Sequence, residues 1–240
     1  IATRAGQPIV ITAVTARDKN RSRDCNLSGV TWVDDPLKLA TMSNVDIVVE
    51  LIGGADGVAK QLAEATLNSG KHYVSANKAL MATHGVALAW LAEKNKVALG
   101  FEASVAGGIP IIKTLREGLA ANNITSVRGI LNGTCNYILT RMRAAHLSFG
   151  DALLEAQQKG YAEADPVADI DGHDTANKLA ILAAIAFGTE PSLQNISIEG
   201  IRRITPIDLE FAADLDCRIK LLGVAQRAAD GIAQRVGACL

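Results

Sequence analysis

The sequence lacks the marks of several large protein classes. Its four cysteines are scattered without CxxC spacing, which predicts reduced thiols, a cytoplasmic location and no zinc site. No apolar run reaches the roughly 18 residues of a membrane-spanning helix, and the opening IATRAGQPIVI lacks the apolar stretch of a signal peptide. The formal net charge is −1, so charge predicts neither a nucleic-acid nor a membrane-surface partner.

Histidines are also few and dispersed. The four of them form no spaced ligand set, so they predict neither a metal site nor catalysis. Apolar residues, in contrast, are abundant. Hydrophobic residues make up 49% of the 240 residues, enough for the core of one large domain or two ordinary ones.

Short β-branched runs alternate with helical patterns through the first half of the chain. The runs that predict strands are 9–14, 45–53, 72–77 and 97–104, and the patterns that predict helices are 36–42, 58–69, 85–94 and 109–121. Strands separated by helices are typical of βαβ units, and apolar runs without alternation are typical of strands covered on both faces. We therefore expect an α/β fold with a doubly wound parallel sheet of the Rossmann type.

The pattern changes after about residue 121. ITSVRGILNGT predicts a strand that ends in an Asn-Gly turn, with Thr134 as the N-cap of the next helix. We divide the chain into a nucleotide-binding domain at 1–121, a second domain of α+β type at 122–205, and a C-terminal segment at 206–240. The sequence leaves the place of this last segment open.

The stretch GYAEADPVADIDGHDTANK concentrates five carboxylates ahead of one lysine, Lys178. The next nine residues, LAILAAIAF, carry no charge, which predicts a buried helix. The Asp-Gly pair is a turn signal, so we expect the helix to begin near His173. Asp174 and Lys178 then lie one turn apart on one helix face.

Two interpretations of this pair stay open. A surface salt bridge contributes well under about 1 kcal/mol and has no chemical role. A partly buried lysine differs, because burial favours its neutral form while the carboxylate favours its charged form. Such a lysine can donate and accept a proton near neutral pH.

The other carboxylates of the stretch are candidates for binding an ammonium group. Glu163 or Asp165 would receive an amino-acid substrate. We interpret Asp169 as a residue that solvates the loop.

Six segments together resemble homoserine dehydrogenase. In chain order they are VVELIGG, YVSANKALM, FEASVAGGIPII, GILNGTCNYILTRM, GYAEADP and DGHDTANK, and the resemblance covers roughly residues 9–205. The resemblance implies an oxidoreductase that interconverts L-homoserine and L-aspartate 4-semialdehyde with NAD(P), in threonine, methionine and isoleucine biosynthesis. It also implies a Rossmann domain followed by a substrate and dimerisation domain, and hence a homodimer.

The resemblance also implies roles for particular residues. Lys178 is the acid and base at the substrate oxygen, with Asp174 beside it and Glu163 on the substrate. Gly160 lies near the cofactor, Lys78 in the active site and Ser75 near the nicotinamide. For Lys78, a solvated lysine at a helix start is the alternative.

The residues themselves give a second set of cofactor candidates. Gly53, with the glycine after it, permits close backbone approach of a cofactor, although paired glycines also simply form turns. Arg17, with Lys19 nearby, follows the first predicted strand, where it could meet a 2′-phosphate. Asp18 opposes this assignment. We therefore favour NADP over NAD.

FEASVAGGIP resembles the family's loop for a monovalent cation. The implied ligands are the Glu102 carboxylate and the main-chain carbonyls of Val105, Gly107 and Ile109, with sodium as the ion. A glycine-rich turn without an ion is the alternative.

The sequence departs from the family at both ends. The first strand and its G-x-G-x-x-G turn, which would bind the pyrophosphate, are missing. Either the sequence lacks an N-terminal portion, which we favour, or the chain does not hold the cofactor normally. A regulatory domain is missing too, which leaves threonine feedback open. Two other functions stay in view: another Rossmann-type amino-acid dehydrogenase, or a non-catalytic module for amino-acid binding or oligomerisation.

Overall fold

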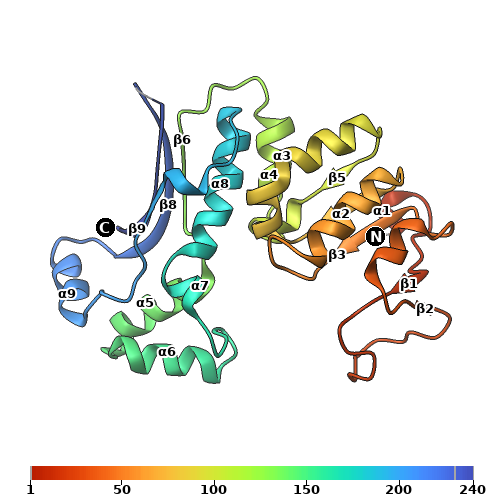
Figure 1. Ribbon diagram of the computed structural model, residues 1–240. Helices are drawn as coiled ribbons and strands as arrows, with labels where there is room; N and C mark the ends of the chain where they lie inside the picture. Colours follow the sequence, from red (N-terminus) through yellow and green to blue (C-terminus); the bar gives the residue numbers. More distant parts are fainter. Residues whose placement is uncertain (1, 230, 240) are drawn as a thin grey trace. The chain divides into compact units, whose positions relative to one another are not determined.

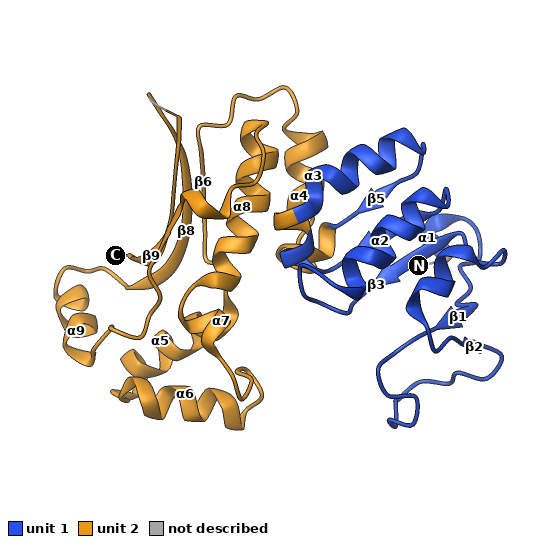
Figure 2. Ribbon diagram, in the orientation of Figure 1, with its two compact units in different colours: residues 1–80, 84–101 blue, residues 81–83, 102–240 orange. Residues whose placement is uncertain are grey.

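The computed structural model describes residues 2–229 and 231–239, and the chain divides into two compact units. Unit 1 comprises Ile1–Leu80 and His84–Phe101, and unit 2 comprises Met81–Thr83 and Glu102–Leu240 (Figure 2). The chain thus passes between units near residue 101, earlier than the domain boundary that the sequence predicts after residue 121. Among the described residues, no helix is both long and apolar enough to cross a membrane.

Unit 1 is a parallel α/β arrangement (Figure 1). Its elements are α1 (Ala2–Ala5), β1 (Ala13–Val14), β2 (Thr31–Trp32), the 3₁₀ helix η1 (Pro36–Thr41), β3 (Ile47–Glu50), α2 (Val58–Asn68), β4 (His72–Ser75), α3 (Lys78–Lys94) and β5 (Leu99–Gly100). β1 and β2 form one parallel pair, and β3, β4 and β5 form a parallel sheet in that order. This confirms the predicted Rossmann-type α/β fold.

The core of unit 1 lies on one face of the sheet. Burial alternates along β3 and β4, with Val48 and Tyr73 buried against Leu62 and Leu67 of α2. On the opposite face Val49 is 61% exposed. The strand predicted at 9–14 is β1, which is shorter than expected and covers Ala13–Val14. Ahead of β1, the described residues hold α1 and no strand.

Unit 2 combines helices with a four-stranded sheet. Its elements are η2 (Glu102–Ser104), α4 (Ile111–Lys113), the π-helix η3 (Thr114–Gly118), β6 (Ser126–Gly129), α5 (Gly133–Ala145), α6 (Phe149–Gln158), α7 (Val167–Ile170), α8 (His173–Phe187), η4 (Leu193–Asn195), β7 (Ile196–Ile198), α9 (Pro206–Asp214), β8 (Lys220–Ala228) and β9 (Gly231–Cys239). The strand order is β6-β8-β9-β7, with β8 antiparallel to β6 and β9, and β7 parallel to β9. The segment that the sequence left unplaced therefore supplies the two central strands.

α8 is the central helix of unit 2. Leu179, Ala180, Ile181 and Leu182 are all buried, so the predicted buried helix is confirmed. Its close packing on β8 depends on Gly223, where an added Cβ would lie 3.0 Å from Leu131 and closer than 3.5 Å to α8.

Three local predictions are corrected. The helix predicted at 109–121 is a short α-helical turn that continues as a π-helix to Gly118. The strand predicted at 97–104 ends at Gly100, because the chain turns into η2 at Glu102. The N-cap of α5 is Asn132, whose Oδ1 accepts the Cys135 amide at 2.8 Å, while the predicted cap Thr134 lies inside the helix.

Candidate active site

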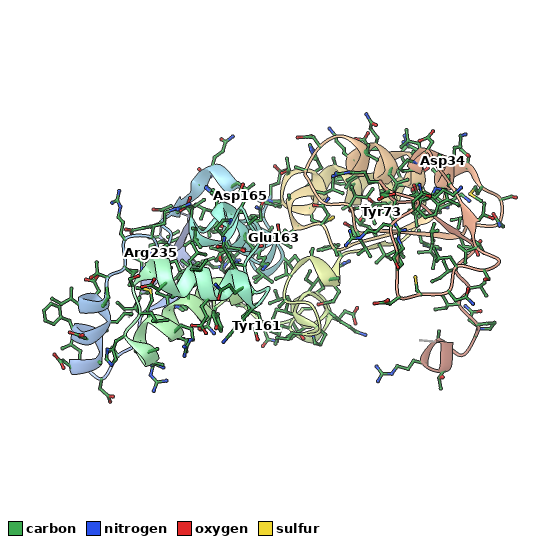
Figure 3. All side chains as sticks on the ribbon, turned by 90° about the horizontal axis from the view of Figure 1, so that it is seen from below. Asp34, Tyr73, Tyr161, Glu163, Asp165 and Arg235 are labelled. Carbon is green, nitrogen blue, oxygen red and sulfur yellow. The ribbon has the colours of Figure 1, made fainter. Side chains whose placement is uncertain are left out.

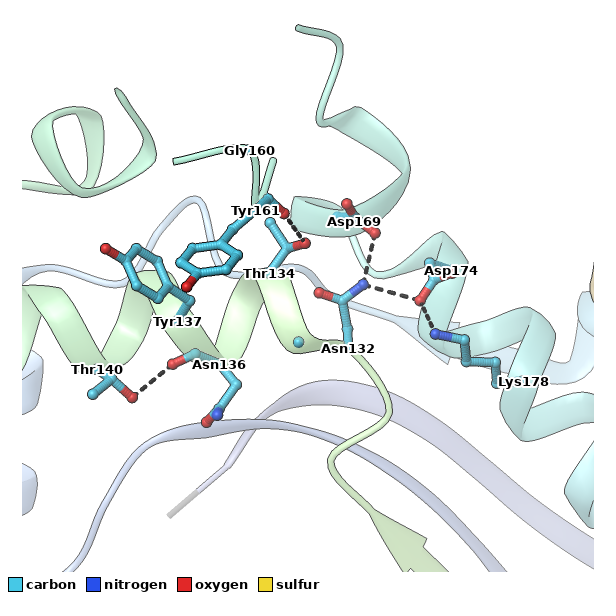
Figure 4. Close-up of a pocket in the computed structure, with 11 residues that line it drawn as sticks. Asn132, Thr134, Asn136, Tyr137, Thr140, Gly160, Tyr161, Asp169, Asp174 and Lys178 are labelled. Carbon is cyan, nitrogen blue, oxygen red and sulfur yellow. Dashed lines mark hydrogen bonds and ion pairs between the residues drawn. The ribbon is translucent and has the colours of Figure 1, made fainter. Parts of the chain in front are cut away.

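A cavity of about 690 Å³ lies within unit 2 where α5, the segment after α6, α7 and α8 meet (Figure 4). The residues that line it are Asn132, Gly133, Thr134, Asn136, Tyr137, Thr140, Gly160, Tyr161, Asp169, Asp174 and Lys178. Three of the residues singled out from the sequence, Gly160, Asp174 and Lys178, are among them.

Lys178 and Asp174 form a partly buried ion pair at the wall of this cavity. The distance from Lys178 Nζ to Asp174 Oδ2 is 2.6 Å, and their side chains are 19% and 7% exposed. Lys178 Nζ also donates to the main-chain oxygen of Leu131 at 2.8 Å. The alternative of a surface salt bridge is therefore wrong, because the carboxylate is withdrawn from solvent.

Asn132 connects this pair to a second carboxylate. Its Nδ2 donates to Asp174 Oδ2 at 2.9 Å and to Asp169 Oδ1 at 2.7 Å (Figure 4). As the N-cap of α5, Asn132 accepts a hydrogen bond from the helix with its side-chain oxygen and donates to the two carboxylates with its side-chain amide. The interpretation of Asp169 as a residue that only solvates the loop is therefore corrected, because Asn132 holds it at the cavity wall.

Glu163 and Asp165 are not among the cavity-lining residues. Both are exposed on the segment between α6 and α7 (Figure 3). The Asp165 carboxylate accepts the Val167 amide at 3.2 Å, and the main-chain oxygen of Glu163 accepts Gln157 Nε2 at 3.1 Å. Among the described lining residues the carboxylates are Asp169 and Asp174, and substrate binding by Glu163 stays a prediction.

Two tyrosines form another wall of the cavity. The rings of Tyr137 and Tyr161 are 4.8 Å apart between centroids and tilted by 50°. Thr134 Oγ1 donates to the main-chain oxygen of Tyr161 at 2.8 Å, which ties the segment after α6 to the first turn of α5. Gly160 permits the turn into this segment because its φ is +73°.

Glu155 holds one of the two tyrosines, Tyr137, through a hydrogen bond. Its carboxylate accepts hydrogen bonds from Lys159 Nζ at 2.7 Å, Tyr137 Oη at 2.7 Å and Arg141 Nε at 2.9 Å. These donors, Lys159 first, lower the pKa of Glu155 to about 2.

The sequence assigned no site role to eight of the cavity residues: Asn132, Thr134, Gly133, Asn136, Tyr137, Thr140, Tyr161 and Asp169. For Asn132 and Thr134 the signal was the Asn-Gly-Thr start of α5, because the first amides of a helix lack helical partners and attract polar side chains. For Asp169, composition alone does not distinguish a solvated carboxylate from one bound by an amide 37 residues away.

The predicted cofactor residues lie in unit 1. Gly53 and Gly54 follow β3 with φ of +87° and +83°, Lys78 is the first residue of α3, and Arg17 is exposed in the segment after β1. Ser75 is completely buried. Its hydroxyl donates to Glu50 and accepts the Asn77 amide, so it is used within the protein.

The predicted cation loop lies in unit 2. Both Glu102 carboxylate oxygens accept main-chain amides at the start of α4, from Ile112 and Lys113, at 2.9 Å each. The main-chain oxygen of Ile109 accepts the Ile111 amide at 2.8 Å. A carboxylate and carbonyls are hard oxygen donors that suit a monovalent cation, and each Glu102 oxygen keeps a second lone pair.

Two models of known protein families match this chain, one over most of each unit. Residues 1–102 match the family model described as "Homoserine dehydrogenase, NAD binding domain", and residues 110–240 match the model of homoserine dehydrogenase. The parallel sheet with its helices defines the class of Rossmann-type α/β proteins. Within that class, the chain belongs to the homoserine dehydrogenase family.

Several relatives are similar over almost the whole chain. Homoserine dehydrogenases of Neisseria gonorrhoeae and Pseudomonas aeruginosa are 47% and 46% identical over 98% of this chain, which covers 54% of each relative. A crystal structure of the Thiobacillus denitrificans enzyme matches with a TM-score of 0.93 and 45% identity, over 99% of this chain and 55% of that one. The chain spans about half the length of the curated relatives it matches.

Proposed function

We propose that the protein is a homoserine dehydrogenase that interconverts L-homoserine and L-aspartate 4-semialdehyde with a nicotinamide cofactor. The observation that supports this most strongly is the Lys178–Asp174 pair in a cavity with a second carboxylate. The alternatives of another amino-acid dehydrogenase and of a non-catalytic module are not favoured by the 42–47% identity to homoserine dehydrogenases. The family implies a place in threonine and methionine biosynthesis.

Lys178 carries the proton transfer in this proposal. Reduction of the semialdehyde leaves negative charge on the C4 oxygen, which takes a proton from Lys178 Nζ. In the oxidation of homoserine, the neutral amine accepts that proton from the hydroxyl. The nicotinamide supplies or accepts the hydride when it is bound. Asp174 and the Leu131 carbonyl orient the amine, since each accepts one of its hydrogen bonds.

Asp169 and Asp174 bind the substrate ammonium group in this proposal. Carboxylates held by an amide donor, as Asn132 holds these two, present their remaining lone pairs to the cavity. Glu163 is the competing candidate and lies on the exposed segment between α6 and α7.

On the cofactor side, the proposal assigns dinucleotide binding to Gly53, Ser75, Lys78 and Arg17. It also assigns cofactor binding to Gly160, which lines the cavity. NADP is favoured over NAD because Arg17 and Lys19 follow β1. A hyperthermophilic archaeal homoserine dehydrogenase solved in complex with NADPH is similar to this chain, with 27% identity and a TM-score of 0.72 over 87% of it.

Two further parts of the proposal concern ions and assembly. A sodium ion would order the turn before α4, held by Glu102, Val105, Gly107 and Ile109.

The protein would be cytoplasmic and act as a homodimer. Light scattering of the full-length protein measures its oligomeric state directly.

The test of the function is an assay of the full-length protein. Homoserine should drive the reduction of NADP or NAD, followed by absorbance at the nicotinamide band, and the semialdehyde should drive the reverse. Other short hydroxy amino acids, serine and threonine among them, serve as controls for a different dehydrogenase. Absence of homoserine-dependent turnover in folded, cofactor-binding protein would contradict the proposal.

A further inference from the structure

Glu50 is a buried carboxylate with no ion-pair partner among the described residues of unit 1. It is the last residue of β3 and is only 1% exposed. Its charge is compensated by three neutral donors: the Ser75 hydroxyl at 2.7 Å, and the main-chain amides of Ile52 and Gly53. A buried carboxylate is strongly disfavoured without such donors, so Glu50 and the loop that supplies them constrain each other.

The loop bound by Glu50 contains the two glycines with positive φ. An added Cβ at Gly53 would meet nothing within 4 Å, and at Gly54 only an atom at 4.0 Å. Glycine is therefore required here by backbone conformation and not by packing. The Glu50 carboxylate holds this conformation, since one of its oxygens accepts both amides of the turn.

The same carboxylate connects this loop to the one after β4. Ser75 is paired with Glu50 in the parallel register, donates to it, and accepts the Asn77 amide at 2.9 Å. Asn77 Nδ2 returns to the main-chain oxygen of Gly54 at 2.7 Å, and its Oδ1 caps α3 at the Leu80 amide. A closed ring of hydrogen bonds therefore joins the carboxyl ends of two neighbouring strands.

The carboxyl ends of the strands are the edge where open parallel sheets bind their ligands. We propose that Glu50 is a positioning residue for the cofactor: its buried carboxylate holds the loops after β3 and β4 in one arrangement, which presents the backbone of Gly53 and Gly54 to the dinucleotide. The inference rests on the proposed function. Lys78 is the first residue of α3 and directly follows its N-cap, Asn77. The same ring of hydrogen bonds therefore fixes the backbone from which the Lys78 side chain extends.

The test compares Glu50→Gln and Ser75→Ala with Glu64→Gln in the full-length protein. Glutamine keeps an acceptor for the two amides but removes the charge and the acceptor for Ser75. Ser75→Ala cuts the connection between the loops and leaves Glu50 bound to its own loop. Glu64 is an exposed carboxylate of α2 and serves as the matched control. Cofactor Kd is measured by NADPH and NADH fluorescence, together with kcat and the KM for homoserine.

Both variants should raise the cofactor Kd about tenfold, the loss expected for one hydrogen bond to a charged group. At saturating cofactor, Glu50→Gln should keep kcat and the homoserine KM close to wild type, and Glu64→Gln should keep all constants close to wild type. If Glu50→Gln does not fold, Ser75→Ala decides. An unchanged Kd in a folded variant, or loss of folding in Ser75→Ala, would overturn the inference. Failure of the proposed function looks different, because wild-type protein would then lack homoserine-dependent turnover.

Discussion

At the scale of single residues, Asn132 is the residue that organises the site. It caps α5 with its oxygen and holds both cavity carboxylates with its amide. The ion pair of Asp174 and Lys178 could be selected from the sequence, because their i, i+4 spacing at the entrance of an uncharged helix is a local pattern. The role of Asp169 could not, because it depends on an asparagine in a different element.

Asp169→Asn tests which carboxylate binds the substrate ammonium group. Removing the charge should raise the homoserine KM about tenfold, the loss expected for one charged hydrogen bond, with kcat near wild type. Glu163→Gln, on the exposed segment, should change KM little. Steady-state kinetics of both variants decide the question: a raised KM in Glu163→Gln alone would return the role to Glu163.

At the scale of elements, α5 and α6 are joined through Glu155, and this contact makes stability depend on pH. Lys159, Tyr137 and Arg141 lower the pKa of Glu155 from 4.5 to about 2. A carboxylate whose pKa is lower in the folded state than in the unfolded state stabilises the folded state at pH values above the unfolded pKa. This stabilisation is lost as the pH falls through the folded pKa.

Glu155→Gln should therefore be less stable than wild type at pH 6, and the difference should shrink between pH 4.5 and about 2. Urea unfolding across this range measures it, with the exposed Glu190→Gln as the control. A difference that stays constant with pH would show that the Glu155 charge does not stabilise the contact.

Gly200 is the point where the segment after β7 meets α7. An added Cβ there would lie 2.1 Å from the main-chain oxygen of Ile170, which accepts the Ile201 amide at 2.8 Å. Gly200→Ala must displace backbone, so we expect a loss of stability of about 1–3 kcal/mol or more in urea unfolding.

Gly150→Ala is the control for this substitution. Its added Cβ would meet Ser148 Oγ at an ordinary 3.9 Å, and alanine favours the α6 helix. Equal stability of Gly200→Ala and Gly150→Ala would show that the chain relieves the contact without strain.

At the scale of the whole molecule, the parallel α/β unit was predictable because its strands and helices alternate along the sequence. The sheet of unit 2 was not. β6 pairs with β8, for example Ser126 with Gln226, across about one hundred residues. Such pairing leaves no local pattern in the sequence, so the sequence alone does not place residues 206–240. β6, which lies in the segment ITSVRGIL, therefore pairs with β8 and not with a neighbouring strand of a hairpin.

The most direct test of the account is the turnover of Lys178→Ala in the full-length protein, in both directions. Loss of the positioned acid and base should lower kcat about 10²–10⁴-fold while cofactor Kd stays close to wild type. Lys178→Arg should not restore turnover, because a guanidinium stays protonated and cannot act as the base. Circular dichroism confirms that each variant is folded. Near-normal kcat in folded Lys178→Ala protein would contradict the account and move the acid role to another residue.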